Sequence, residues 1–391
     1  MAVEAARVPA RSRPESFGRV LTQVIAVGIA VVVAAFLGSI IILLYGENPL
    51  TVYETVWRFG TSRPQDFARV LENATPLIFS ALAVAVAFKA GMFNIGVEGQ
   101  YIVGMATAAA AALALDFLPA PLLLPAAVLA SMLGAMLWAA VPAVLKVRTG
   151  AHEVVTTIMM NGIAGSFVAW LLLNPLRTSD RGLVDLRTDI FSERALVPSI
   201  AQTFGIEDVI PPSVNLTWLF PVALFAAFIV WFLLRRTRLG YDVRAVGASA
   251  GAAEAGGIDI GRTQIKIFLI SGALAGLVGL NHILSDTGYL GSNYQTSLGF
   301  DGIAVAFLGR ADPFGIVAAA ILVGMLNRGQ DGIAVTTDLP NEILIILQGV
   351  LILSVVVAYE VVNRAAARRV QQQVRTEEAR TPEGLGGEDE D

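Results

Sequence analysis

Apolar runs of about 20 residues recur along this chain, and they constrain its fold more than any other feature. A helix needs about 20 apolar residues to cross the hydrocarbon core of a bilayer. The runs show almost no alternation of apolar and polar residues, so they favour helices over the strands of a membrane barrel. Charged residues make up only 15% of the sequence, and the mean hydropathy is +0.67. We therefore expect an all-α, polytopic membrane helical bundle.

The apolar runs predict about ten transmembrane helices. The first run is longer than the roughly 7–15 residues of a signal-peptide core, so we expect it to remain as an uncleaved span. The eighth and ninth runs are short and are separated by "GRADPFG", which fits a broken or re-entrant element. The predicted spans lie near 20–45, 70–88, 99–118, 122–145, 154–174, 216–234, 264–284, 298–311, 314–327 and 341–363.

Lysine and arginine residues gather before the first span and after the fourth, sixth and last spans. The positive-inside rule assigns such segments to the cytoplasm. Both termini are then cytoplasmic, which requires an even number of spans and agrees with ten. The expected parts are a cytoplasmic N-terminal segment (1–19), a transmembrane domain (20–363) with an extracytoplasmic loop (175–215) and a cytoplasmic loop (235–266), and a disordered, polar cytoplasmic tail (364–391).

Residues suited to catalysis or metal binding are scarce. The chain has no cysteine, which excludes disulfides, thiolate metal sites and cysteine nucleophiles. His152, in "HEVVT", lacks the second histidine that a zinc-protease helix carries four residues later. The phosphate-binding pattern G-x-x-x-x-G-K-[ST] is absent, so any ATP hydrolysis would belong to another subunit. We expect no catalytic residue, no metal site and no bound cofactor; the net charge of -5 owes much to the acidic tail and indicates no nucleic-acid partner.

A polar stretch, "AFKAGMFNIGVEGQ" at 87–100, interrupts two strongly apolar runs. It places Asn94, Glu98 and Gln100 at or near membrane depth. A carboxylate at the centre of a membrane helix costs about 2.5–3.5 kcal/mol, so such residues usually face a cavity or a partner. The stretch therefore predicts a helix break beside a pathway. Alternatively, Lys89 and Glu98 lie at the cytoplasmic mouth or pair with each other and hold helices together.

A second polar stretch, "SLGFDGIAVAFLGRADPFG" at 297–315, lies in the other half of the chain. Its residues 300–303 faintly echo residues 93–96, and each set follows a glycine-rich break. Glycine-interrupted segments in two halves suggest internal repeats with discontinuous helices around a central site. The alternative is that these glycines only permit close packing, as in the small-xxx-small pattern of 272–276.

The cytoplasmic loop 235–266 contains a short helix-prone run, 248–255, between Gly247 and Gly256-Gly257. A helix of small residues with a stop on each side suits docking into a groove of a soluble partner. The alternative is an ordinary solvated connector.

At these places the chain resembles the permease subunits of bacterial ABC importers for branched-chain amino acids, simple sugars and nucleosides, and it is most similar to the nucleoside-type branch. The matching segments are "FNIGVEGQ" (93–100), "GAHEVVTTIMMN" (150–161), "RAVGASAGAAEAGGI" (244–258) and "GFDGIAVAFLGR" (299–310). The similarity runs from about residue 20 to 363.

The resemblance implies an assembly in the bacterial cytoplasmic membrane. Its expected partners are cytoplasmic ABC ATPase subunits that bind ATP and Mg, a second permease of the same or a homologous sequence, an extracytoplasmic substrate-binding lipoprotein, and membrane lipid. It also implies that 247–257 forms the helix that couples the permease to the ATPase. The expected coupling residues are Arg244, Gly247, Ala252, Ala253, Glu254, Gly256 and Gly257.

The function expected from the resemblance is translocation of nucleosides by alternating access, with no chemistry in this subunit. A simple-sugar permease of the ribose or galactose type is the nearest alternative. An ion-driven secondary transporter would use the carboxylates Glu98, Glu153 and Asp301, and a membrane scaffold or receptor would transport nothing. The candidate pathway residues are Phe93, Asn94, Glu98, Gln100, Thr157, Asn161 and Asp301.

Overall fold

The computed structural model describes residues 32–33, 35–180, 185–336 and scattered positions between 345 and 357. The chain divides into a smaller unit, Met1–Pro49 with Glu342–Asp391, and a larger unit, Leu50–Asn341. In the smaller unit, Ala35–Leu44 is helical. The predicted span at 341–363 and the two terminal segments fall wholly or largely outside the described residues, as does the first half of the predicted span at 20–45, so they stay predictions.

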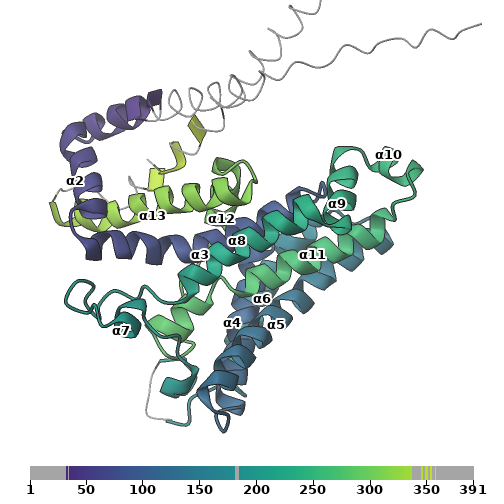
Figure 1. Ribbon diagram of the computed structural model, residues 1–391, viewed down its shortest axis with the longest axis horizontal. Coiled ribbons are helices and arrows are strands. Elements are labelled where there is room, and N and C mark those ends of the chain that lie inside the picture. Colours follow the sequence, from purple (N-terminus) through teal and green to yellow (C-terminus); the bar gives the residue numbers. More distant parts are fainter. Residues whose placement is uncertain are drawn as a thin grey trace, which may run out of the picture. The chain divides into compact units, whose positions relative to one another are not determined.

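The larger unit is built from helices (Figure 1). In its described residues, extended pairing is limited to two isolated bridges. A 3-10 helix, η1 (Glu193–Ala195), and a π-helix, η2 (His282–Asp286), lie in connections. The α-helices are α2 (Pro49–Thr61), α3 (Pro64–Phe88), α4 (Val97–Ala114), α5 (Ala120–Thr149), α6 (Glu153–Leu173), α7 (Ile200–Phe204), α8 (Leu219–Arg236), α9 (Arg238–Ala248), α10 (Ala250–Ala255), α11 (Ile260–Gly276), α12 (Leu298–Leu308) and α13 (Pro313–Thr336).

The all-α class is confirmed for the described residues, and helices occur where five of the apolar runs between 70 and 234 predict them. By length and composition, α3, α5, α6 and α8 can each cross a membrane. α12 is apolar but shorter. The total of ten spans and the orientation of the termini stay predictions.

α3 lies at the centre of the larger unit and packs against α8, α11, α12 and α13. Its second half is rich in alanine and valine, and nearly all of these side chains are buried. α11 also packs closely on α5, where a Cβ atom added to Gly276 would lie 2.6 Å from the Ser131 carbonyl oxygen. The Ser131 hydroxyl donates to the Gly276 carbonyl at 2.6 Å. The glycines of 272–276 thus serve close helix packing, as the small-xxx-small pattern predicts.

Four elements differ from the hydropathy prediction. The span expected at 264–284 ends as an α-helix at Gly276 and continues through a turn into η2. α13 extends to Thr336, well beyond the predicted end at 327. α2 and α9 were not predicted, because both carry charged and polar residues on an exposed face that lower their mean hydropathy.

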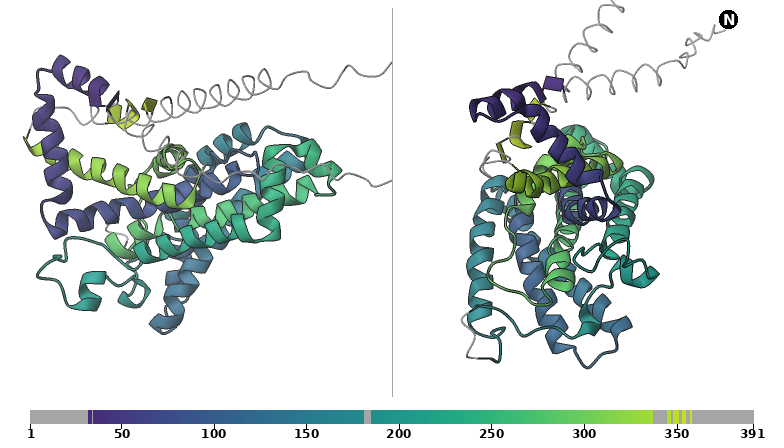
Figure 2. Two further views of the ribbon diagram at one scale, coloured as in Figure 1. Left: turned by 45° about the horizontal axis from the view of Figure 1, so that its top comes forward. Right: turned by 90° about the vertical axis from the view of Figure 1, so that its left-hand side faces the viewer.

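α9 and α10 project together at one end of the larger unit (Figures 1 and 2). α11 begins shortly after α10 ends, so its start lies at this end too. The end of α5 lies beside it, since a Cβ atom at Gly261 would lie 2.8 Å from a methyl of Val147. α7 and the segment around it lie far from α9 and α10 (Figure 2). There the backbone near 188 pairs with 290, where the Thr188 N–H donates to the Leu290 carbonyl at 2.9 Å.

Candidate functional site

The polar stretch at 87–100 is a helix break, as predicted. α3 ends at Phe88, and α4 begins at Val97. The turn that stops α3 places Gly91 at a φ of 70°, in the left-handed region that favours glycine. The break leaves unpaired backbone groups at the start of α4. The side chains of Asn94, in the break itself, and Asn161, on α6, supply partners for them.

Asn94 and Gln100 bond to each other across the break. The Asn94 Nδ2 donates to Gln100 Oε1 at 2.9 Å, and Gln100 Nε2 donates back to Asn94 Oδ1 at 3.0 Å. Asn94 also donates to the Ser271 hydroxyl of α11 at 2.8 Å and accepts from the Gly96 N–H. Both amides are buried. In this arrangement they brace the break, and their contact with substrate stays a prediction.

Asn161 of α6 closes the break from another side. Its Oδ1 accepts from the Gly99 N–H at 2.9 Å, and its Nδ2 donates to the Ile95 carbonyl at 3.0 Å. One amide thus satisfies both a donor and an acceptor that the break exposes. Thr157, one turn earlier, is buried and donates to the Glu153 carbonyl, while a Cβ atom at Gly96 would lie 3.1 Å from the Thr157 Cβ. The segments 93–100 and 150–161 therefore meet.

Glu98 joins the starts of two helices. It lies in the first turn of α4, yet its Oε1 accepts from the Ser297 N–H and its Oε2 from the Gly299 N–H, both at 2.8 Å. These donors belong to the start of α12, where a carboxylate is favoured. The hydroxyl of Tyr101 lies 3.0 Å from Glu98 Oε1 and 2.8 Å from the Gln295 carbonyl oxygen. This geometry matches the alternative in which Glu98 holds helices together, although its partner is not Lys89.

The start of α12 is packed tightly against its neighbours. A Cβ atom at Gly299 would collide with the backbone of Glu98, and one at Gly302 would collide with Ser80 of α3. Ser80 donates to the Leu298 carbonyl at 2.8 Å. The echo between 93–96 and 300–303 does not mark equivalent positions, because the first set precedes α4 and the second lies inside α12. What the two regions share is a helix that starts within the bundle.

Phe93 and Asp301 are partly exposed. The Phe93 ring stacks on Phe307, with centroids 6.0 Å apart, and its edge contacts Phe88 at 6.4 Å. Phe88 and Phe307 are themselves exposed. Asp301 lies in the first turn of α12. Asn161 is partly exposed too, but both ends of its amide are already bonded to the break.

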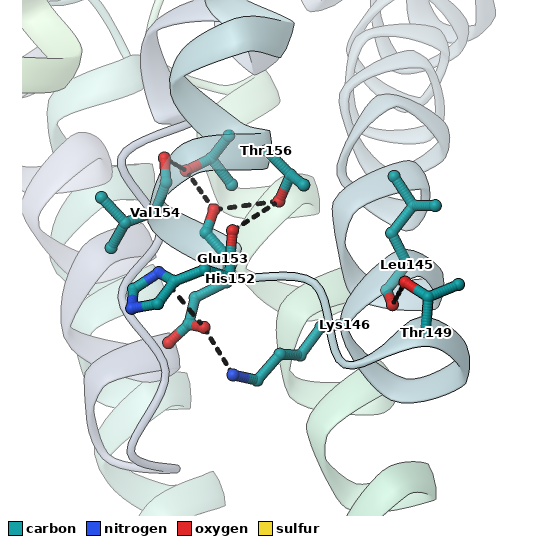
Figure 3. Close-up of polar contacts among 8 residues, drawn as sticks. Leu145, Lys146, Thr149, His152, Glu153, Val154 and Thr156 are labelled. Carbon is teal, nitrogen blue, oxygen red and sulfur yellow. Dashed lines mark hydrogen bonds and ion pairs between the residues drawn. The ribbon is translucent and has the colours of Figure 1, made fainter.

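Glu153 forms an ion pair at the start of α6 (Figure 3). Its Oε2 lies 2.7 Å from Lys146 Nζ at the end of α5, and the His152 ring lies on the other side at 4.0 Å. The carboxylate is mostly buried, whereas the His152 side chain is largely exposed. The pair joins the end of α5 to the start of α6 across a three-residue turn.

The loop 235–266, predicted to be cytoplasmic, differs from the predicted helix at 248–255. α9 runs to Ala248, Ser249 adopts an extended backbone, and α10 begins at Ala250. The Ser249 hydroxyl accepts from the Ala252 N–H at 3.3 Å, which explains the new helix start. Ala253 is buried, so it is not available to a partner in this structure. The other predicted coupling residues are exposed: Arg244, Gly247, Ala252, Glu254, Gly256 and Gly257.

Comparison with known proteins identifies the family. A family described as "Branched-chain amino acid transport system / permease component" matches residues 67–356. A guanosine ABC transporter permease protein of Bacillus subtilis is 34% identical over 85% of this chain and 93% of its own length. This chain belongs to that permease family.

Other relatives of this permease have related names. A nucleoside ABC transporter permease protein of Lactococcus lactis is 32% identical over 85% of this chain and 90% of its own length. A glucose ABC transporter permease protein of Haloferax volcanii is 28% identical over 83% of the chain and 85% of its own length. A solved inward-facing structure of a putative metal-chelate type ABC transporter covers 84% of this chain and 93% of its own at 16% identity, with a TM-score of 0.38, which is too low to carry an argument.

The chain is therefore a multi-pass membrane permease component, which transports rather than catalyses. Sequence reasoning missed three residues that support the break and the start of α12: Ser271, Tyr101 and Ser80. Tyr101 had a local signal, since it lies three residues after Glu98 on one helix face. Ser271 and Ser80 looked like ordinary small residues of apolar helices, and only tertiary structure reveals their partners.

Proposed function

We propose that this permease is the transmembrane subunit of an ATP-driven importer that translocates nucleosides by alternating access. The observation that carries the proposal is the similarity, at 34% and 32% identity over most of the chain, to a guanosine and a nucleoside permease. Both alignments include the break and the loop that follows α8, since each spans 85% of the chain.

The geometry of the break supports a moving part at this place. Its backbone is held by side-chain hydrogen bonds from Asn94, in the break itself, and from Asn161 of α6. Asn94 is in turn bonded to Gln100 of α4 and Ser271 of α11. Such bonds can be exchanged without unwinding a helix. Irregular backbone in a membrane domain is tolerated where protein or a water-filled pathway surrounds it.

The partly exposed residues of this region suit a nucleoside. A nucleoside offers a flat base and a ribose rich in hydroxyl groups. The ring cluster of Phe88, Phe93 and Phe307 offers aromatic faces for stacking. The Asp301 carboxylate offers acceptors for hydroxyl or amino groups. We propose these residues as contacts, with Asn94, Glu98, Gln100, Thr157 and Asn161 positioning the backbone behind them.

The proposed assembly contains cytoplasmic ATPase subunits that bind ATP and Mg, a second permease, and a substrate-binding lipoprotein, in a bacterial cytoplasmic membrane. The exposed faces of α9 and α10 are the proposed docking surface for the ATPase. Tyr241 is 62% exposed there, beside the exposed Arg244. A large exposed aromatic with a neighbouring arginine is a common composition for a protein contact.

A sugar substrate is the second candidate, because the glucose permease of Haloferax volcanii is also similar over most of the chain. An ion-driven mechanism has less support. Glu153 is ion-paired with Lys146, and Glu98 accepts two backbone hydrogen bonds, so neither carboxylate is free to carry an ion in this arrangement.

Reconstitution tests the proposal. The permease is placed in proteoliposomes with its ATPase, its second permease and its binding protein, and uptake of labelled guanosine, uridine, ribose and glucose is measured. We expect nucleoside uptake that requires ATP and the ATPase. Uptake driven by a proton or sodium gradient without ATP, or uptake of sugars alone, would contradict it.

A further inference from the structure

Two glycines on one face of α9, one near each end, allow this helix to approach neighbouring backbone closely. Near its start, a Cβ atom at Gly240 would lie 2.6 Å from the Leu234 carbonyl oxygen of α8. Near its end, a Cβ atom at Gly247 would collide with the Lys89 carbonyl oxygen. The two glycines are seven residues apart, about two helical turns, so they lie on the same face. Val243 and Val246, on that side, are buried.

The second of these contacts reaches the helix break directly. Gly247 meets the backbone of the first residues after α3, since its Cβ position is 3.0 Å from the Lys89 carbonyl carbon and 3.3 Å from the Gly91 nitrogen. A Cβ atom at Gly91 would in turn lie 3.6 Å from the Gly247 Cα. The approach is backbone to backbone. Because backbone atoms meet directly, no flexible side chain lies between α9 and the break to absorb a movement of α9.

The opposite face of α9 is open. Tyr241 and Arg244 are exposed on the helix whose buried face contacts the break. α11, the helix that follows the loop, contacts the break through the Ser271 hydroxyl, which accepts from Asn94. The break is therefore contacted by α9 before Asn94 and by α11 at Asn94 itself.

We infer that Gly247 is a positioning residue that passes the movement of α9 to the α3–α4 break. The inference rests on the proposed function, in which α9 and α10 dock on an ATPase. Gly247 itself need not touch the ATPase. Its role is to let two backbones meet, so that α9 and residues 89–91 move as one body.

The first test compares two glycine substitutions in the full complex. Gly247→Ala inserts a methyl between the two backbones, whereas Gly165→Ala adds one in open space on α6. For Gly247→Ala we expect normal association with the ATPase but a roughly five- to tenfold fall in substrate moved per ATP hydrolysed. Gly165→Ala keeps the wild-type ratio. A merely structural defect would lower ATPase association and uptake together, and an unchanged ratio in Gly247→Ala would overturn the inference.

The second test does not depend on the folding of that variant. Because the chain has no cysteine, Lys89→Cys with Ala248→Cys gives a single thiol pair beside the contact. After assembly, the pair is joined by a short, cleavable thiol reagent, with each single variant as control. We expect uptake to persist, because the joined segments move together. Loss of uptake that cleavage reverses would overturn the inference, whereas absence of ATP-driven uptake in the wild-type complex would refute the proposed function instead.

Discussion

The starts of α4 and α12 solve the same problem with different chemistry. Both helices begin inside the larger unit, where their first N–H groups need acceptors. α4 begins against the neutral amide oxygens of Asn94 and Asn161. α12 begins against the carboxylate of Glu98, which comes from the first turn of α4. The start of α4 is held by Asn161 of α6 and by Asn94, which is itself bonded to α11. The start of α12 is held by Glu98 of α4.

The difference teaches how the two helices depend on each other. Because Glu98 belongs to α4 and bonds to α12, a shift of α4 displaces the acceptor of α12. The reverse dependence is weaker, since the amides that hold α4 lie in the break and on α6. We therefore expect damage at Glu98 to spread over both helices and damage at Asn161 to stay with α4.

The largest effect is expected for Glu98→Ala. It leaves the N–H groups of Ser297 and Gly299 without their acceptor, at a cost of about 1–3 kcal/mol each. The expected loss is about 2–6 kcal/mol, seen as a large fall in the melting temperature of the detergent-solubilised permease. Glu98→Gln keeps one acceptor oxygen, so its fall is smaller.

Glu207→Gln, at an exposed position, is the control for loss of one negative charge and leaves the melting temperature unchanged. If Glu98→Ala melts like the wild type, α12 does not depend on this carboxylate, and the contrast between the two helix starts disappears.

A smaller effect is expected for Asn161. Asn161→Asp keeps the acceptor for Gly99 but loses the donor to Ile95, whereas Asn161→Ala loses both. We expect a loss of about 1–3 kcal/mol for the alanine variant. We expect the aspartate variant to be destabilised too, because its charge would lie in a partly buried position and the donor to Ile95 is lost. Asn174→Ala, at the exposed end of the same helix, removes only a bond within that turn. Equal melting temperatures for Asn161→Ala and Asn174→Ala would mean that the Asn161 hydrogen bonds from α6 do not stabilise the start of α4.

The break itself could be predicted from sequence, but its partners could not. Glycine and polar residues between two apolar runs indicate an interruption from local composition alone. The hydrogen bond from Asn94 to Ser271 joins residues 177 positions apart, and that from Ser297 to Glu98 spans 199 positions. A single serine in an apolar helix gives no sign of such a partner. Asn94 and Gln100 therefore looked free to face a cavity, although each satisfies the other.

Hydropathy likewise predicted the apolar helices and missed α9. Four helices are long and apolar enough to stand out by themselves. α9 buries only a narrow stripe that includes Val243 and Val246, so its average composition resembles a solvated loop. The contact of Gly247 with Lys89 depends on α9, which hydropathy did not predict. The sequence of the loop therefore predicted docking on a partner but not a contact between the loop and the helix break.

The start of α6 offers a third case, where a carboxylate has a cation as its partner. Lys146→Met removes the partner of Glu153, and Glu153→Gln removes the acid. Because the lysine is about one-third exposed, we expect each single variant to lose only about 1 kcal/mol. The double variant is expected to lose less stability than the sum of the two single losses. Melting temperatures of the wild type, the two single variants and the double variant measure this difference. Additive losses would mean that the 2.7 Å pair contributes nothing of its own.

The smallest effect is expected for Asp189, a partly exposed counterpart of Glu98. Its Oδ1 accepts from the Thr178 hydroxyl at 2.6 Å and from the Ser179 N–H at 2.8 Å. These hydrogen bonds, that from Thr178 foremost, lower the pKa of Asp189. A lowered pKa stabilises the folded form above the unfolded pKa of about 3.9, and the gain is lost as pH falls through the folded value.

Asp189→Asn should therefore reduce the melting temperature slightly at pH 7, by less than about 1 kcal/mol of stability because solvent screens the site. The gap to the wild type should close below about pH 4. Asp185→Asn, at an exposed position of the same loop, serves as control and shows no gap at either pH. A gap for Asp189→Asn that stays constant down to pH 3 would mean that the hydrogen bonds, and not the charge, carry the effect. The contrast with Glu98 would then rest on burial alone.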